Sequence, residues 1–181
     1  MHPGQIMGTF TTKDGRSVFI RAIDLGDVEG LLNYINALID EDAPISTNER
    51  QTYLSEVRFV ADEIQRMLKG DLLSLVALAE GKIIAHADIR RGSGRTKHVG
   101  TLSIGVLAGW RNVGLGYELI RILLNLARAE NYKLIRLEVY VHNVSAIHLY
   151  EKLGFAQTGM VPKMGLFKEG YTDALVMCRE L

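Results

Sequence analysis

The chain has 181 residues, of which 48% are hydrophobic and 23% charged, as is typical of one compact globular domain. Its 21 Lys and Arg balance its 21 Asp and Glu, which argues against a general affinity for nucleic acid or for an anionic membrane surface. No apolar run approaches the roughly 18 residues of a membrane span, and signal-peptide features are absent, so we expect a cytoplasmic protein without membrane or nucleic-acid partners.

Hydrophobic periodicity predicts a mixture of strands and helices. The expected ranges in chain order are 18–23 (strand), 28–39 and 53–69 (helices), 72–79, 82–90 and 98–106 (strands), 116–131 (helix), 133–141 (strand), 144–153 (helix), and 156–161 and 172–180 (strands). Asp27 suits the N-cap of the first helix, and Asn143 that of the last. Glu80 and Gly81 form a connection typical of a tight hairpin.

No internal repeat or low-complexity segment divides the chain. We therefore assign residues 1–12 to a partly flexible N-terminal tail and residues 13–181 to a single domain. The one cysteine, Cys178, has no partner for an internal disulfide and lies in an alternating apolar stretch, which indicates a structural thiol. The histidines show no metal-ligand spacing, so no metal site is predicted.

The most informative segment is Arg111–Tyr117, which follows a predicted strand and opens an amphipathic helix. Glycine at positions 114 and 116 removes Cβ obstruction, so consecutive backbone N–H groups can turn toward a phosphate at the helix N-terminus. Arg111 can add charge-assisted hydrogen bonds to such an anion. The segment lacks the third glycine of a dinucleotide-binding motif, and the chain has no P-loop Gly-Lys-Ser/Thr.

Arg111, Gly114 and Gly116 match the signature of the GNAT superfamily of acetyltransferases, which this chain resembles. A second stretch is similar to the cofactor segment that follows the fifth strand of that family. Its matching residues are Asn143, Ala146, Leu149, Tyr150, Lys152, Gly154 and Phe155. The order of the predicted elements agrees with the family from Val18 to the C-terminus.

The resemblance implies an α/β fold of the α+β type. We expect a single GNAT-like domain whose mixed, mostly antiparallel sheet is splayed between its fourth and fifth strands, residues 98–106 and 133–141, and flanked by about four helices. A bulge at Gly105 would help to separate these strands. The family often forms homodimers through its C-terminal strands, so a homodimer is possible for this chain.

The resemblance also implies an N-acetyltransferase with acetyl-CoA as co-substrate and direct attack by a primary amine in a ternary complex. Tyr150 would act as general acid toward the departing thiolate, and Asn143 would hydrogen-bond the pantetheine. Glu41 and Asp42, after the first helix, would line the acceptor pocket and favour a cationic amine. The residues implied to contact CoA are Ile104, Gly105, Val106, Arg111, Asn112, Val113, Gly114, Leu115, Gly116, Tyr117, Asn143 and Tyr150.

The motifs leave the general base open, because residues 101–106 lack the glutamate that many family members carry there. Glu138 is our candidate, with Asp88, His86 and His142 as alternatives that act directly or through water. We expect the acceptor to be a small-molecule amine, such as an amino acid or polyamine. A protein N-terminus or lysine is the alternative acceptor, and a non-catalytic CoA-binding regulatory module is the alternative from a different functional class.

Overall fold

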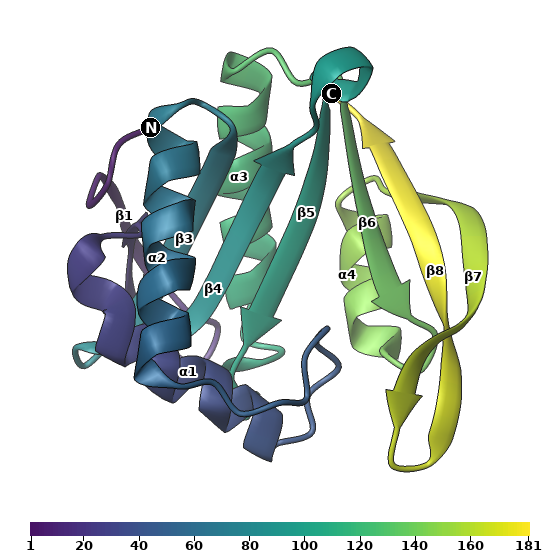
Figure 1. The fold of residues 1–181 in the computed structure, drawn as a ribbon, viewed down its shortest axis with the longest axis horizontal. Helices are drawn as coiled ribbons and strands as arrows, with labels where there is room; N and C mark the ends of the chain where they lie inside the picture. Colours follow the sequence, from purple (N-terminus) through teal and green to yellow (C-terminus); the bar gives the residue numbers. More distant parts are fainter.

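The computed structural model describes residues 1–181 as one eight-stranded sheet with helices on both faces (Figure 1). The strands are β1 (Ile6–Thr11), β2 (Ser17–Ala22), β3 (Leu72–Ala79), β4 (Lys82–Arg91), β5 (Val99–Val106), β6 (Leu134–Tyr140), β7 (Ala156–Phe167) and β8 (Gly170–Glu180). Their order is β1-β2-β3-β4-β5-β6-β8-β7, and only β5 and β6 pair in parallel. The predicted mixed and mostly antiparallel sheet is confirmed.

Four α-helices cover the sheet, as expected. They are α1 (Val28–Asp40), α2 (Tyr53–Leu68), α3 (Leu115–Ala129) and α4 (Val144–Lys152), and the short 3-10 turns are η1 (Leu25–Asp27), η2 (Gly94–Thr96) and η3 (Ala108–Trp110). α1 and α2 pack on one face of the sheet, whereas α3 and α4 pack on the other (Figure 1). Each helix buries its apolar stripe, so the sheet separates two hydrophobic cores. None of the helices has the length and apolar character needed to cross a membrane.

Three details differ from the sequence-based expectation. Ile6–Thr11, which we placed in the N-terminal tail, forms the edge strand β1 and pairs antiparallel with β2. β7 and β8 are longer than expected and form a hairpin that extends past the end of β6 (Figure 1). Asp27 does not cap α1 with its side chain, because its carboxylate accepts two hydrogen bonds from Arg21, at 2.7 and 2.5 Å.

β5 and β6 form a V-shaped opening. They pair only where Val99–Thr101 lies beside Leu134–Arg136, and they separate beyond these three residue pairs (Figure 1). β5 stays paired with β4 up to Val106, so one edge of residues 102–106 has no strand partner. The predicted splay is therefore confirmed. The predicted bulge at Gly105 is wrong, because the register between β4 and β5 is unbroken through this residue.

The packing of α1 explains why residue 105 is glycine. Tyr34 of α1 is only 5% exposed, and its hydroxyl occupies the space that a Cβ at position 105 would need. The same Cβ would lie 3.0 Å from Leu38 Cδ1. Glycine at this position lets α1 approach the end of β5 closely, beside the opening between β5 and β6.

A buried polar cluster lies next to this contact, between α2 and the strands β3 and β4. Glu63 is 0% exposed, and one of its carboxylate oxygens accepts a hydrogen bond from Arg90 at 2.7 Å. The second carboxylate oxygen of Glu63 lies 3.7 Å from His86 Nε2, which is also 2.9 Å from Ser74 Oγ. Asp88 is 7% exposed. Burial raises the pKa of Asp88 to about 7, with Glu63 adding to the effect and His86 and Arg90 opposing it.

We expect Gly105→Ala to lower the free energy of unfolding by about 1–3 kcal/mol, the usual range for overpacking a tight site. The cause would be the clash of the new methyl group with the Tyr34 hydroxyl. Adding Tyr34→Phe should restore part of the loss, because the phenylalanine ring leaves the space of the hydroxyl free. Chemical denaturation of the two single variants and the double variant measures this coupling, and additive losses would contradict the assignment.

We expect Asp88→Asn to stabilise the protein at neutral pH but not in acid. The folded pKa of Asp88, about 7, exceeds its ordinary value of 3.8, so wild-type stability falls as pH rises from about 4 to about 7 and is level above that. The difference in the free energy of unfolding between Asp88→Asn and wild type should therefore grow from about pH 4 to about pH 7 and reach a few kcal/mol. Denaturation at pH 4, 6 and 8 measures it, with Asp71→Asn as control, and an equal gain at every pH would contradict the shift.

Candidate active site

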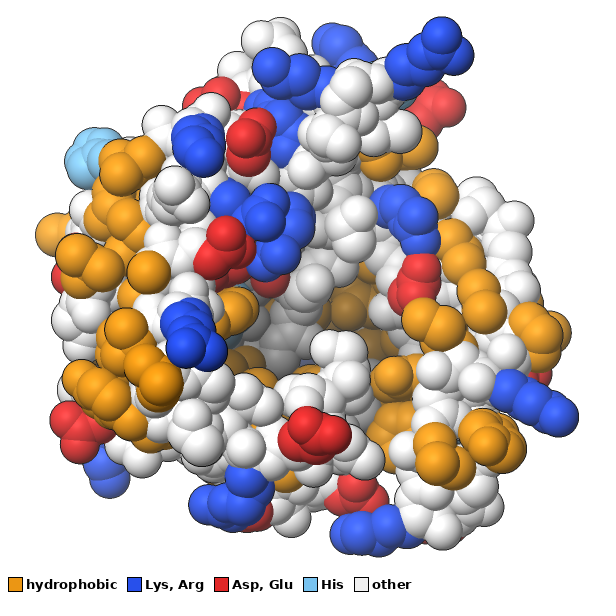
Figure 2. Space-filling model, viewed as in Figure 1, with side chains coloured by type: hydrophobic (Ala, Val, Ile, Leu, Met, Phe, Trp, Pro, Cys, Tyr) orange, Lys and Arg blue, Asp and Glu red, His pale blue; other side chains and the backbone are white.

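The separation of β5 and β6 opens into a cavity of about 860 Å³, visible as a hollow at the centre of the face in Figure 2. The ends of β1 and β5, the loop before α3, the whole length of α4 and the loop after α1 line it. Of the twelve residues implied to contact CoA, ten line this cavity: Ile104, Gly105, Val106, Arg111, Asn112, Gly114, Gly116, Tyr117, Asn143 and Tyr150. The other two, Val113 and Leu115, direct their side chains into the hydrophobic core.

The glycine loop places the start of α3 against the cavity. Gly114 is the N-cap residue of α3 with a φ of 91°, a left-handed conformation in which side chains other than that of glycine are strained. No side chain caps the helix. The N–H groups of its first turn have no partners within the helix, so they are available to an anion at the cavity wall.

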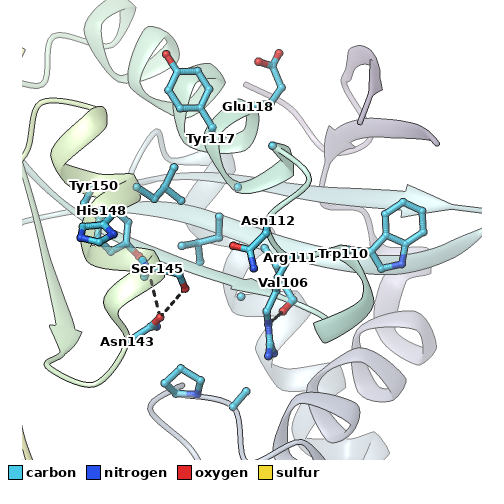
Figure 3. A pocket seen from close by; sticks show the side chains of 18 of the residues that line it. Val106, Trp110, Arg111, Asn112, Tyr117, Glu118, Asn143, Ser145, His148 and Tyr150 are labelled. Atoms are coloured by element: carbon cyan, nitrogen blue, oxygen red, sulfur yellow. Dashed lines mark hydrogen bonds between the residues drawn. The ribbon is translucent and has the colours of Figure 1, made fainter. Parts of the chain in front are cut away.

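Arg111 is turned away from this loop (Figure 3). Its guanidinium donates to the Val106 carbonyl at 2.8 Å and forms an ion pair with Glu41 at 2.6 Å. The backbone N–H of Ala108 donates to the second oxygen of Glu41 at 3.2 Å. The sequence assigned Arg111 to the CoA site and Glu41 to the acceptor site. In the structure the ion pair between these two residues joins the end of α1 to the end of β5.

A different cation lies beside the glycine loop. A Cβ at Gly114 would lie 3.7 Å from Lys13 Cε and 3.5 Å from Phe10 Cζ. The backbone N–H of Lys13 donates to the Val113 carbonyl at 3.0 Å, which fixes the end of β1 against the loop. None of the ten ion pairs of the protein includes Lys13. Sequence reasoning missed this residue, because no motif connects β1 with the loop about 100 residues later.

α4 carries the two polar residues of the second motif. Asn143 Oδ1 accepts hydrogen bonds from Ala146 N and Ser145 Oγ, each at 3.4 Å, as expected of an N-cap (Figure 3). Tyr150, two helical turns later, lines the same cavity and is 7% exposed. Burial raises the pKa of Tyr150 to about 12. The amide of Asn143 keeps its NH₂ group for a ligand, and the Tyr150 phenol stays protonated at neutral pH.

The structure separates the four candidate bases. His142 lines the cavity, stacks on Tyr140 with ring centroids 5.8 Å apart, and places Nδ1 3.3 Å from Thr172 Oγ1. Glu138 lies outside the cavity lining and is ion-paired with Arg136 at 2.5 Å.

The remaining two candidates, His86 and Asp88, belong to the buried cluster under α2 and also lie outside the cavity lining. Of the four, His142 alone is brought to the cavity wall together with Asn143 and Tyr150.

The loop after α1 lies at the open end of the V between β5 and β6 (Figure 1). Ala43, Pro44 and Ile45 of this loop line the cavity. Asp42, assigned from the sequence to the acceptor pocket, has a φ of 51° and lies 3.4 Å from Lys168 in the turn between β7 and β8. The loop thus connects the two arms of the V.

Comparison with known proteins gives the same assignment. Residues 35–155, more than half of the chain, match the acetyltransferase (GNAT) family. An L-amino acid N-acetyltransferase from Escherichia coli (strain K12) is 34% identical over 110 residues, which cover 58% of this chain and 66% of that relative. The chain thus spans just under two thirds of the relative's length.

Solved structures share the fold. A ribosomal-protein-alanine N-acetyltransferase from Brucella melitensis has a TM-score of 0.79 at 23% identity, over 90% of this chain and 99% of that one. A GNAT superfamily phosphinothricin acetyltransferase from Sinorhizobium meliloti, solved in complex with acetyl-CoA, has a TM-score of 0.77 at 20% identity, over 91% and 88% of the two chains. With its splayed sheet, its glycine loop and the family match, the chain belongs to the GNAT family of acetyl-CoA-dependent N-acetyltransferases.

Proposed function

We propose that this enzyme transfers the acetyl group of acetyl-CoA to the primary amine of a small molecule by direct attack in a ternary complex, with L-amino acids as the acceptor class. The observation that carries the proposal is the cavity between β5 and β6, where the end of β5, the glycine loop and Tyr150 face one space. The acceptor class follows the E. coli relative, which is an L-amino acid N-acetyltransferase.

The residues of the cavity fit acetyl-CoA. The first-turn N–H groups of α3 would hold the pyrophosphate. Because Glu41 neutralises Arg111, Lys13 beside Gly114 would supply the positive charge at this position. Pantetheine is an extended chain with two amides, which matches the free edge of β5 from Ile104 to Val106. Asn143 would donate its amide N–H to the same chain from the opposite wall.

Tyr150 acts on the leaving sulfur in this proposal. Its pKa of about 12 makes it a hydrogen-bond donor at neutral pH. Complete transfer of its proton to a thiolate of ordinary pKa, about 8.5, would be uphill by roughly 5 kcal/mol. The main contribution of Tyr150 is therefore a hydrogen bond that stabilises the negative charge developing on the sulfur.

Proton removal from the acceptor falls to His142. An ammonium group has no lone pair for attack, so a base must take a proton before or during the reaction. His142 is the candidate base that lines the cavity, and its contact with Thr172 orients the ring. Glu138 is the second candidate, because it lies on β6, four residues before His142 in the chain.

The loop after α1 supports a small acceptor rather than a peptide. Its contact with the β7–β8 turn, between Asp42 and Lys168, crosses the end of the V that a peptide would enter. Ala43 and Pro44 present apolar surface to the cavity at this end. Both charged side chains are exposed, so the pair contributes little to stability and the loop can open for substrate.

The test is the rate of CoA thiol release from acetyl-CoA over a panel of L-amino acids, polyamines and N-terminal peptides. We expect release with one or more L-amino acids and none with polyamines or peptides. Tyr150→Phe should lower kcat about 100-fold, the usual effect of losing one donor at a developing charge, with little change in KM for acetyl-CoA. A Tyr150→Phe variant with wild-type kcat would contradict the role of the hydroxyl.

Two further variants assign the base in the same assay. His142→Gln should lower kcat/KM well below the wild-type value, whereas Glu138→Gln should leave kcat/KM near the wild-type value. The opposite result would assign the role of general base to Glu138. Acetylation of peptides instead of small amines would overturn the acceptor class, and CoA binding without turnover by any amine would favour a regulatory module.

A further inference from the structure

Part of the sheet face that carries α1 and α2 is left uncovered. In Figure 1 no helix lies in front of β5 and β6, between α2 and the β7–β8 hairpin. Side chains alternate along a strand, and Leu102 and Leu137 belong to the core on the opposite face. Their neighbours Thr101 and Arg136 therefore point to the uncovered side, where Thr101 is exposed.

Two arginines flank Thr101 in one row across the sheet. Thr101 lies opposite Arg90 of β4 and opposite Arg136 of β6, in the last residue pair before β5 and β6 separate. Neighbouring strands are about 4.8 Å apart, so the Cα atoms of the two arginines are about 10 Å from each other. The side chain of each arginine is 43% exposed. We call these three residues the arginine row, which lies at the closed end of the opening between β5 and β6.

The arginine row has hydrogen-bond donors to spare. Arg90 donates through Nη2 to Glu63 at 2.7 Å, and Arg136 donates through Nη2 to Glu138 at 2.5 Å. A guanidinium carries several N–H donors, so one such bond leaves others for a ligand. Nε of Arg136 is buried and has no hydrogen-bond partner at all. A buried donor without an acceptor is uncommon in folded proteins and indicates that a partner is missing.

The chemistry of the row fits a carboxylate. The fork of N–H groups on a guanidinium matches the two oxygens of a carboxylate, and both bonds are strengthened by the opposite charges. The Thr101 hydroxyl between the two arginines can donate a further hydrogen bond. In Figure 2 charged side chains lie on both sides of the hollow, as expected of a site for a charged ligand.

The position of the row places such a carboxylate beside the reaction. The free edge of β5 begins directly after Thr101 and runs to Val106, just before the glycine loop. With the pyrophosphate at that loop, the pantetheine would run back along β5 and its acetyl end would point toward Thr101. The amine and the carboxylate of an α-amino acid share one carbon atom. A carboxylate bound at the row would therefore hold the amine next to the acetyl group.

We infer that Arg90, Thr101 and Arg136 bind the α-carboxylate of the acceptor and thereby select amino acids over amines that lack a carboxylate. The inference deepens the proposed function and rests on it, because it assigns residues that recognise the proposed acceptor class. Polyamines, which carry only positive charge, are repelled by the same row.

The test compares kcat/KM for acetyl transfer to L-amino acids with kcat/KM for their α-amides, which keep the amine and the side chain. We expect wild type to prefer the acids roughly 10- to 100-fold, as for one set of charged hydrogen bonds. Arg136→Gln should reduce this preference at least several-fold, mainly through a higher KM for the acid, and should leave kcat/KM for the amide unchanged. Arg121→Gln is the control, because Arg121 is also exposed and ion-paired but lies on α3, across the sheet.

A preference for the acids would not come from the reactivity of the amine. The carboxylate favours the charged ammonium form of the neighbouring amine, so at neutral pH the amide has more of its amine in the reactive form.

Two further variants test the other members of the row. Thr101→Val keeps the shape of an exposed side chain and should reduce the preference several-fold. Loss of Arg90 alone would leave the buried Glu63 without its partner, so Arg90→Gln is combined with Glu63→Gln. The double variant should also lower the preference.

The outcomes separate the inference from the proposed function. Equal use of acids and amides by wild type would overturn the carboxylate site while acetyl transfer to small amines stands. A preference that Arg136→Gln and Thr101→Val both leave intact would also overturn it, because the carboxylate would then bind elsewhere. Acetylation of no amino acid, amide or other small amine would overturn the proposed function, and the inference with it.

Discussion

The early end of the pairing between β5 and β6 is the constraint on which the rest of the site depends. Three residue pairs hold the two strands together, and beyond them each strand is supported from its other side, β5 by β4 and β6 by β8. Backbone N–H and C=O groups along the free edge of β5 lack a strand partner. A cavity therefore forms inside the sheet, with its hydrogen-bonding groups already in place.

Contacts around this opening keep it in shape. α1 approaches β5 closely because position 105 has no side chain, and Arg111 joins Glu41 at the end of α1 to the Val106 carbonyl. On the other arm, α4 holds Tyr150 and Asn143 two turns apart. These supports are rigid packing and charge contacts of the scaffold, which is the arrangement that keeps reacting groups in position.

Positive charge is distributed unevenly around the cleft despite the neutral chain. Arg111, the basic residue of the motif, is neutralised by Glu41, whereas Lys13 and Lys152 beside the proposed path of the donor have no acidic partner. Both lysines line the cavity in which the proposed donor, a polyanion, would bind. The folded protein thus provides a local field that its composition does not indicate.

The sequence was sufficient for the elements with strong periodicity and for the motif on α3, because these features depend on neighbours along the chain. It could not predict β1, since Ile6–Thr11 contains Gly8 and no clear alternation. Contacts between distant residues were also out of reach. Tyr34 beneath Gly105 and Arg111 beside Glu41 each join positions about 70 residues apart, so neither the close approach at the glycine nor the ion pair of the arginine could be predicted.

The most direct test of the account is backbone amide hydrogen exchange with and without acetyl-CoA. If the free edge of β5 holds the pantetheine, amides within residues 102–106 and at the start of α3 should exchange more slowly when acetyl-CoA is bound, while β3 should be unaffected. Unchanged exchange in both of these segments under saturating acetyl-CoA would contradict the central claim that the opening between β5 and β6 is the donor site.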